Sequence, residues 1–386
     1  METTKVDDKY SALSDYFSTH LSWHKARIKF FVLLITALCK MQTVCFERLA
    51  EGMDSNAQIS SCLRRIQRFF ADFSIGKDKI ASVLFSLLPC KSDLIISIDR
   101  TNWQFGKTDI NIFMLSVCYD GMAFPILWKM PAKSGNSNCQ ERIELIKKFI
   151  TIFGKECIEA IVADREFIGK EWLMFLQSEV IPYHIRIKDN MWFTKPDGEK
   201  IRMSWILQGC KINEGYHHPK MLYLDKALVY VSGMKIKNGE YLITVSYNKQ
   251  QQALLNYKQR WQIETMFKAF KTKGFNIEDT HLSDIDRIDK LVAVVSIAFT
   301  WAYKAGIYVH HHIKPIAIKT HKRKAHSFFK YGLKFITNAL LVHIDQLLTF
   351  INVCHVLRLK ILLLEAVICF LSLCTRKRKI SDLKKK

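Results

Sequence analysis

The stretch YKQRWQIETMFKAFK at residues 257–271 gives a helix two unlike sides. At about 100° per residue, one stripe of about 80° carries a phenol, three cations and a single carboxylate, namely Tyr257, Arg260, Glu264, Lys268 and Lys271. A separate arc is apolar and consists of Ile263, Met266, Phe267 and Phe270. Such a helix buries the apolar arc and presents the charged stripe. A lone acid among bases suits a site where the acid holds a cation and the bases hold phosphates.

Composition narrows the class of protein. The chain has 386 residues, 49% of them hydrophobic, which predicts a folded protein of two or three domains. The net charge is +22, from 58 basic and 36 acidic residues, and such an excess is typical of proteins with a polyanionic partner. Because the basic residues interleave with aromatic residues, we predict that the polyanionic partner is a nucleic acid. The alternative is a basic protein that its charge keeps soluble.

The eleven cysteines form no C-x-x-C pair, and we expect no signal peptide, so the sequence predicts reduced thiols and no zinc site. His310–His312 are expected in a loop, because adjacent histidines in regular structure cannot all face one metal ion. The apolar runs Ile28–Cys39 and Ile361–Cys374 are short and interrupted by charges, so we predict buried helices and no membrane partner. The basic residues from Arg376 onward form a tail that either contacts phosphate or is merely solvated.

Residues 1–92 are predicted to be a helical DNA-binding region. Apolar positions recur at helical spacing in four segments, Ser11–Leu21, His24–Met41, Val44–Gly52 and Ala57–Phe73. The last two form a helix pair around a turn, and the second helix carries Arg64, Arg65 and Arg68. This arrangement resembles a DNA-reading helix pair; the alternative is a helical bundle with a basic face.

Residues 93–310 are predicted to form a mixed α/β sheet with helices. Strands are expected at Leu94–Ile98, Asn111–Tyr119, Met122–Met130, Ile158–Ala163 and Tyr183–Lys188. Helices are expected at Cys139–Phe153 and Gly169–Glu179. A small β insertion, about residues 189–246, should precede the helix that bears Glu264. The long apolar stretch Ile285–Tyr308 and the C-terminal region 311–386 are expected to be helical.

Three acids suggest a metal site. Asp99 and Asp164 are each expected to end a buried strand, at the edge of the sheet where α/β proteins bind ligands. Glu264 completes the set, and carboxylate oxygens are natural ligands of Mg²⁺. Two such ions, roughly 4 Å apart, activate an attacking oxygen and stabilise a leaving one. Taken alone, each aspartate could instead cap a turn. Glu264 alone could instead form an exposed ion pair.

Motifs for other chemistries are missing. The sequence has no phosphate-binding G-x-x-x-x-G-K-[ST], no G-x-S-x-G and no H-E-x-x-H. An ATP-driven motor, an α/β hydrolase and a zinc protease are therefore disfavoured.

Three motifs in order make the chain resemble the DDE transposases of bacterial insertion sequences. The spacing Y-x2-R-x3-E-x6-K is matched at Tyr257, Arg260, Glu264 and Lys271. The first aspartate lies in IDRTNW at residues 98–103 and the second in VADREF at residues 162–167. The resemblance covers roughly residues 40–340, with the β insertion between the second and third motifs.

The resemblance implies an RNase H-like core in which Asp99, Asp164 and Glu264 bind divalent metal, Mg²⁺ or Mn²⁺, as two ions. It also implies that Tyr257, Arg260 and Lys271 contact DNA phosphates, and helix geometry adds Lys268. Trp261 is expected to pack behind the charged stripe, and Trp103 in the core. The role of Glu166 is open between a fourth acidic neighbour and a solvent-facing side chain.

Related enzymes form a DNA hairpin with an aromatic residue of the insertion holding a flipped base. Trp192, Trp205 and Tyr241 are unranked candidates for that role.

The resulting interpretation is a cytoplasmic, nucleoid-associated transposase that acts as a homodimer on double-stranded DNA. It would bind terminal inverted repeats, cut the ends by metal-dependent hydrolysis and join the 3′ ends to target DNA. One alternative is a metal-dependent nuclease without strand transfer. Others are a catalytically inactive DNA-binding protein on the same scaffold and a structural basic protein. Which segment pairs the subunits is open, with the helices after residue 310 as candidates.

Overall fold

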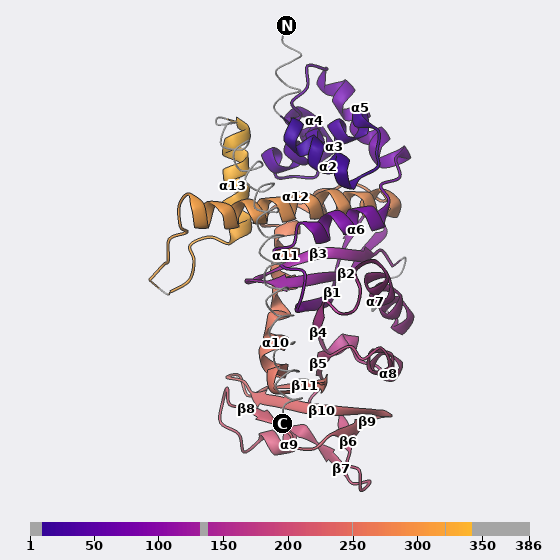
Figure 1. Ribbon diagram of the computed structural model, residues 1–386, viewed down its shortest axis with the longest axis vertical. Helices are drawn as coiled ribbons and strands as arrows, with labels where there is room; N and C mark the ends of the chain where they lie inside the picture. Colours follow the sequence, from indigo (N-terminus) through magenta and orange to yellow (C-terminus); the bar gives the residue numbers. More distant parts are fainter. Residues whose placement is uncertain (1–9, 132–137, 249, 321, 342–386) are drawn as a thin grey trace, which may run out of the picture. The chain divides into compact units, whose positions relative to one another are not determined.

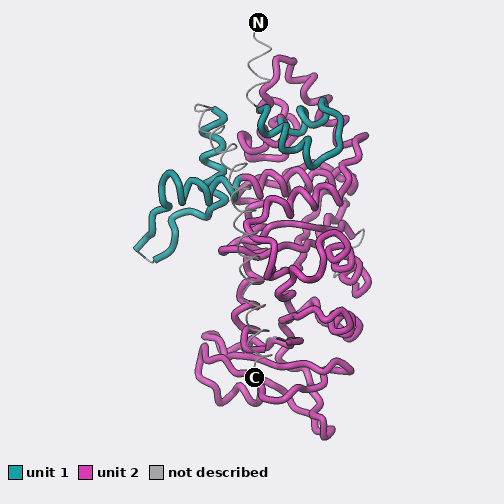
Figure 2. The backbone as a smooth tube through the Cα atoms, viewed as in Figure 1, with its two compact units in different colours: residues 1–32, 302–386 teal, residues 33–301 magenta. Residues whose placement is uncertain are grey.

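The computed structural model describes residues 10–131, 138–248, 250–320 and 322–341. The chain divides into two compact units, one of residues 33–301 and one that combines residues 1–32 with 302–386 (Figure 2). The predicted domain boundaries near residues 92 and 310 divide the chain by expected function and not by compactness. They stay a prediction.

The helices and strands are labelled as in Figure 1. The helices are α2 (Ser11–His20), α3 (Lys25–Met41), α4 (Phe46–Gly52), α5 (Ile59–Asp72), α6 (Lys77–Ser86), α7 (Cys139–Phe153), α8 (Lys170–Ser178), α9 (Met203–Leu207), α10 (Ala253–Gln259), α11 (Trp261–Phe270), α12 (Ile285–His312) and α13 (Phe328–Leu341). Short 3₁₀ turns are η1 (Arg165–Phe167), η2 (Gln250–Gln252) and η3 (Ile277–Asp279). The strands are β1 (Leu94–Phe105), β2 (Thr108–Tyr119), β3 (Met122–Lys129), β4 (Ile158–Ala163), β5 (Tyr183–Ile187), β6 (Trp192–Thr194), β7 (Lys200–Arg202), β8 (Gly215–His217), β9 (Leu222–Leu224), β10 (Ala227–Lys235) and β11 (Tyr241–Tyr247).

One mixed sheet organises the larger unit. Its strand order is β3-β2-β1-β4-β5-β11-β10-β9-β6-β7, with β8 paired to β10. β4 pairs in parallel with β1 and β5, whereas β1, β2 and β3 pair antiparallel. This is the predicted RNase H-like mixed α/β core. Figure 1 shows α10 and α11 on one side of these strands and α7 and α8 on the other.

The sequence explains the start of this sheet. β2 is buried from Ile110 to Cys118, as expected for a strand covered on both faces. Asp120 and Gly121 both have positive φ angles, 43° and 83°, which suits a two-residue hairpin turn between β2 and β3. The parallel strand β4 needs a long crossover, and α7 supplies it. Asn138 and Glu141 form a capping box that begins α7.

The predicted β insertion is present, but it is not separate from the core. β11 pairs antiparallel with β5 from Ile243↔Ile187 to Tyr247↔Tyr183, so the insertion extends the core sheet. The short strands β6, β7 and β8 and the helix α9 were not predicted, because segments of three to five residues carry too few positions to reveal a period.

The N-terminal helices agree with the predicted segments. α5 buries Cys62, Ile66 and Phe69, whereas Arg64 and Arg68 are exposed on its other side. The helix α6 also forms, although the sequence analysis did not single it out. Lys290 ties the end of α5 to α12 by donating to the carbonyl of Phe70 at 2.8 Å.

α12 corrects one expectation. His310–His312 lie in its last turn and not in a loop. α12 is long and apolar enough to cross a membrane, but 83% of its most apolar window is buried within the protein. The bent pair of α3 and α4 passes the same test of composition only when its two helices are taken together. The apolar run Ile361–Cys374 and the basic tail lie outside the described residues.

Two glycines allow α12 and α13 to cross closely. A Cβ added at Gly306 would overlap the carbonyl of Phe328, and one added at Gly332 would overlap the carbonyl of Ala302. Backbone therefore meets backbone at this crossing, and no larger residue fits without separating the helices.

We expect Gly306→Ala and Gly332→Ala each to lower the melting temperature, because overpacking of this kind costs about 1–3 kcal/mol. Differential scanning calorimetry measures the shift. Gly209→Ala is the matched control, since a Cβ there meets no atom within 4 Å. Equal melting temperatures for all three variants would contradict the tight crossing.

Candidate functional site

Strand pairing brings the two predicted aspartates side by side. The last parallel pair between β1 and β4 is Ile98↔Ala163, and Asp99 and Asp164 are the next residues of the two strands. Neighbouring strands lie about 4.8 Å apart, so the two carboxylates start from adjacent positions. Asp164 follows the end of β4 as predicted. Asp99 does not end its strand, because β1 continues to Phe105 through antiparallel pairing with β2.

Each aspartate carboxylate is held by the backbone of the next residue. Asp99 Oδ1 accepts from the Arg100 N–H at 2.8 Å, and Asp164 Oδ1 accepts from the Arg165 N–H at 2.8 Å. These matching contacts restrict both side chains at the edge of the parallel pairing.

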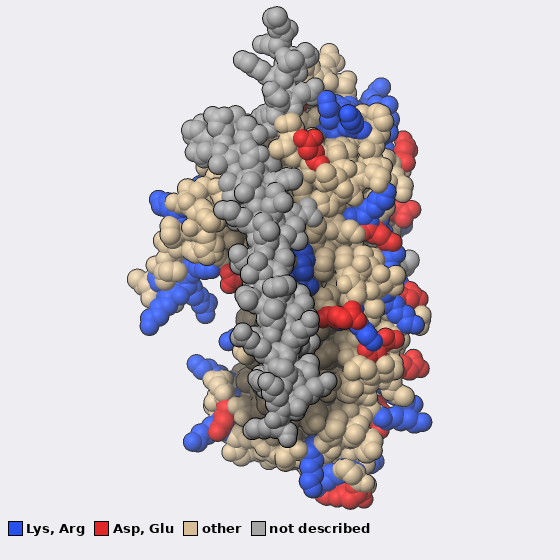
Figure 3. Space-filling view, viewed as in Figure 1, with Lys and Arg blue, Asp and Glu red and all other residues tan. Residues whose placement is uncertain are grey.

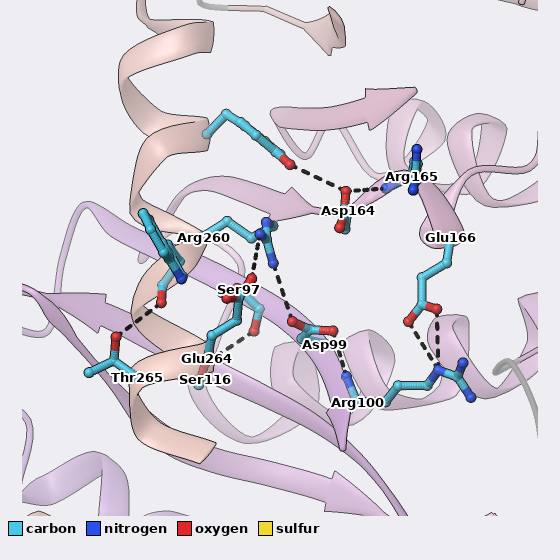
Figure 4. A network of polar contacts seen from close by, with 12 residues as sticks. Ser97, Asp99, Arg100, Ser116, Asp164, Arg165, Glu166, Arg260, Glu264 and Thr265 are labelled. Carbon is cyan, nitrogen blue, oxygen red and sulfur yellow. Dashed lines mark hydrogen bonds and ion pairs between the residues drawn. The ribbon is translucent and has the colours of Figure 1, made fainter. Parts of the chain in front are cut away.

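Arg260 links Asp99 to the third predicted acid. Its Nη1 donates to Asp99 Oδ2 at 3.3 Å and its Nη2 donates to Glu264 Oε1 at 2.7 Å (Figure 4). One guanidinium therefore contacts both carboxylates. The Tyr257 hydroxyl donates to Asp164 Oδ1 at 3.3 Å, so Tyr257 and Arg260 of the predicted stripe together contact all three acids.

The charges in this cluster are partly removed from water. Burial raises the pKa of the Asp99 carboxyl to about 6, while the Arg100 amide and the Arg260 guanidinium act against that rise. Burial also raises the pKa of Tyr257. For Arg260, burial opposes the charged form, but Tyr257, Glu264 and the two aspartates raise its pKa overall. Asp99 is thus a carboxylate whose negative charge is only partly compensated.

Glu166 has a definite partner. Arg100 Nε donates to both of its carboxylate oxygens, at 3.1 and 3.2 Å. This ion pair joins the residue after Asp99 to the turn after Asp164 (Figure 4). The buried Arg142 holds the same turn by donating to the carbonyls of Glu166 and Ile168. Glu166 is therefore an acidic neighbour of Asp99 that is engaged in an ion pair, and its side chain does not simply face solvent.

The end of the predicted stripe departs from an ideal helix. α11 ends at Phe270, so Lys271 lies just past it. Lys271 Nζ donates to the carbonyl of Asn102 at 3.1 Å and pairs with Glu278 at 2.7 Å. Lys268 is exposed, as the stripe predicts.

Two tryptophans correct the expected packing. Trp261 is 63% exposed and does not pack behind the charged stripe. The helical period by itself predicts this exposure, because it puts Trp261 about 60° from Glu264 and on the opposite side of the helix from the buried Ile263. Trp103 is half-buried and not in the core, with Lys271 Nζ 5.7 Å from its ring centroid.

Arg186 is a site residue that the sequence analysis missed. On β5, Ile185 pairs with Ala163, so Arg186 occupies the position beside Asp164. Its charge lowers the pKa of the Tyr257 hydroxyl, and its buried Nε has no hydrogen-bond partner among the described residues. A buried N–H without an acceptor is costly, which favours an anionic ligand here. Only the pairing of β4 with β5 reveals this position.

The aromatic candidates of the insertion separate into two settings. Trp192 and Trp205 are 44% and 52% exposed, with ring centroids 5.2 Å apart in an edge-on contact. The Arg202 guanidinium lies 4.3 Å from the Trp192 centroid. Tyr241 is half-buried at the start of β11, where it pairs with Lys235 of β10.

The three acids have the type of ligand atom that a hard cation prefers. Asp99, Asp164 and Glu264 supply carboxylate oxygens, which Mg²⁺ and Mn²⁺ prefer. Within the described ranges, however, no group of three or more acids, histidines or cysteines is already arranged to hold an ion. Arg260 explains this, because it contacts two of the three acids itself. In chemical kind, the three carboxylates fit a divalent metal.

Comparison with known proteins identifies one family. The family model described as "Transposase DDE domain" matches residues 91–301. No curated protein matched the sequence. Among solved structures, the C-terminal lobe of a budding yeast Argonaute has 9% sequence identity and a TM-score of 0.21, which is too low to support an argument. The match covers 72% of this chain and 61% of that one.

Asp99 leads to a prediction about pH. Its pKa rises from 3.8 to about 6 on folding, so the folded state holds the proton more tightly than the unfolded chain. The stabilising effect of that proton is therefore present below about pH 4 and is lost as pH rises through about 6. In metal-free buffer, we expect the wild-type melting temperature to fall relative to that of Asp99→Asn as pH increases from about 4 to 7.

The exposed Asp109→Asn serves as the control for removing one acid from a strand. Its melting temperature should stay at a constant offset from the wild type across this range. A constant offset for Asp99→Asn as well would show that burial does not perturb Asp99.

Proposed function

Because the chain belongs to the transposase DDE domain family, we propose that it cuts and joins DNA at the cluster of Asp99, Asp164 and Glu264. The observation that carries the proposal is the register of β1 and β4, which puts the two aspartates at adjacent positions. The contacts of Arg260 to Asp99 and Glu264 support the third member.

The three acids are the proposed ligands of divalent metal, Mg²⁺ or Mn²⁺, as two ions. Such ions, when bound, activate the attacking oxygen and stabilise the leaving oxygen of a phosphodiester. Arg260 partly compensates the charges of Asp99 and Glu264 in the DNA-free protein and is released to a phosphate when DNA enters. Its guanidinium suits both partners, since it pairs with carboxylate and phosphate through the same fork.

The basic side chains and the Tyr257 phenol around the acids are the proposed contacts to the DNA backbone. Tyr257, Arg260, Lys268 and Lys271 come from the sequence motif and its helical stripe, and Arg186 joins them from the sheet. Lys271 would exchange its contacts with Asn102 and Glu278 for phosphate. Arg64, Arg65 and Arg68 on α5 are the proposed contacts to the terminal repeats.

The finer assignment is an insertion-sequence transposase of the branch with Y-x2-R-x3-E-x6-K spacing. It would act in the cytoplasm as a homodimer on paired ends and join the 3′ ends to target DNA. A nuclease without strand transfer is the enzymatic alternative, and incubation of pre-cut ends with a plasmid separates the two by joined products. The second alternative is a catalytically inactive DNA-binding protein on the same scaffold. Metal-dependent nicking of end-containing DNA would exclude it.

We expect Asp99→Asn, Asp164→Asn and Glu264→Gln each to reduce strand cleavage by more than roughly 100-fold, because each removes a proposed metal ligand. Binding to end-containing DNA should remain, since the cationic contacts are unchanged. Cleavage is measured on labelled DNA with Mg²⁺, and binding by gel shift without it. Cleavage at the wild-type rate would remove the altered residue from the set.

Arg186→Gln should weaken binding of end-containing DNA and reduce the slope of log K against log salt by about one, the effect of losing one phosphate contact. The exposed Lys79→Gln removes the same charge from α6 and is the control. If both variants have the wild-type slope, Arg186 does not contact phosphate.

A further inference from the structure

The segment between α12 and α13 forms an ordered hairpin of basic residues. The Lys319 N–H donates to the Arg323 carbonyl at 2.9 Å, and the Ala325 N–H donates to the Ala317 carbonyl at 2.8 Å. Ile318 and Lys324 form an antiparallel bridge within it. Lys322 has a φ of 60°, the left-handed conformation of a tight turn. We call the described residues 314–320 and 322–324 the basic hairpin.

The base of the hairpin is tied to both neighbouring helices. Ile316 is buried, and its N–H donates to His310 Nδ1 on α12 at 2.8 Å. The Tyr331 hydroxyl on α13 donates to the Lys314 carbonyl at 3.0 Å. Lys324 Nζ lies 3.7 Å from the centroid of Phe328. These contacts attach the base of the hairpin to both helices.

The charges of the hairpin are not balanced locally. From Lys290 to Leu341 the sequence has nine lysines and arginines and no acid. Five of these cations belong to the basic hairpin, and all five are exposed, namely Lys314, Lys319, Lys322, Arg323 and Lys324. Among the described residues, no acid pairs with Lys314, Lys319, Lys322 or Arg323. Figure 3 shows Lys and Arg side chains gathered over this loop.

Holding like charges together on one hairpin costs free energy through mutual repulsion. A polyanion removes that cost by replacing its counterions with the cations of the hairpin. We infer that the basic hairpin is a second DNA-binding surface, which contacts the phosphate backbone of duplex DNA independently of base sequence.

Side-chain chemistry favours backbone contact over base recognition. Among its described residues, the exposed part of the hairpin has lysines and an arginine but no aromatic ring on which a base could stack. An anionic membrane surface would also attract these charges. Among the described residues of the hairpin and its first neighbour, the large exposed apolar side chains are Ile313 and Ile318, which are too few for insertion between lipids.

The inference rests on the proposed function only in taking DNA as the natural polyanion. Its test uses metal-free buffer and a short duplex of random sequence, so it needs neither cleavage nor the correct ends. Absence of metal-dependent cleavage would overturn the proposed function and leave this test unaffected.

The test variant is Lys319→Gln/Lys322→Asn/Arg323→Gln in the full chain. Asparagine tolerates the left-handed conformation at position 322, so the turn is retained. We expect affinity for the random duplex to fall at least about tenfold, and the slope of log K against log salt to fall by about two to three. Fluorescence anisotropy across a salt series gives both quantities.

Two control variants isolate the arrangement of charge. Lys79→Gln/Lys107→Gln/Lys226→Gln removes the same charge from exposed residues on separate elements and should change the slope by less than about one. Lys319→Arg/Arg323→Lys keeps the hairpin charge and should bind as the wild type does. Circular dichroism melting checks that each variant is folded.

Equal losses in the hairpin and dispersed variants would overturn the inference, because net charge alone would then explain binding. Vesicles of phosphatidylglycerol and phosphatidylcholine test the other polyanion. Hairpin-dependent binding to vesicles, with DNA binding unchanged, would also overturn it and assign the hairpin to a lipid surface.

Discussion

The parallel pairing of β1 with β4 is the constraint on which the candidate site depends. It ends at Ile98↔Ala163, and each strand then continues directly into an aspartate. A shift of one residue in this register would move one carboxylate to the opposite face of the sheet. Residues around the pairing, such as Ile96 and Ile161, are fully buried, so a shift would require the core on both faces of the sheet to repack. The hydrophobic core therefore sets the spacing of the acids.

Arg260 is the second determinant, since it balances the charges that this spacing brings together. Its side chain is only 12% exposed, and it contacts Asp99 and Glu264 from the helix pair α10–α11. Buried ion pairs of this kind add little net stability, because desolvation offsets much of the attraction. Under the proposed function their value lies in geometry, because the guanidinium that contacts two acids in the free protein would pair with a phosphate when DNA binds.

The sequence predicts those parts of the fold that depend on local patterns. The apolar run Ile158–Ala163 and the helix Cys139–Phe153 have the predicted bounds, because strong periodicity and a capping box mark them. The sequence pattern could not show that β1 continues past Asp99, because residues 100–104 have no apolar pattern and are held in the strand by pairing with β2.

The same limit applies to the site. The motif spacing identifies Tyr257, Arg260 and Glu264 because they share one helical face, and they contact one another or the aspartates. Lys271 departs from that face where α11 ends, and Arg186 acquires its position only through pairing between strands. Trp261 is different, since its exposed position follows from the helical period alone.

The most direct test of the account is a crystal structure of the protein with Mn²⁺ and end-containing DNA, using anomalous scattering to locate the metal. The account predicts manganese about 2.0–2.2 Å from oxygens of Asp99 and Asp164, with Glu264 completing the site and Arg260 on a phosphate. Manganese bound elsewhere, with Arg260 still bridging Asp99 and Glu264, would contradict it.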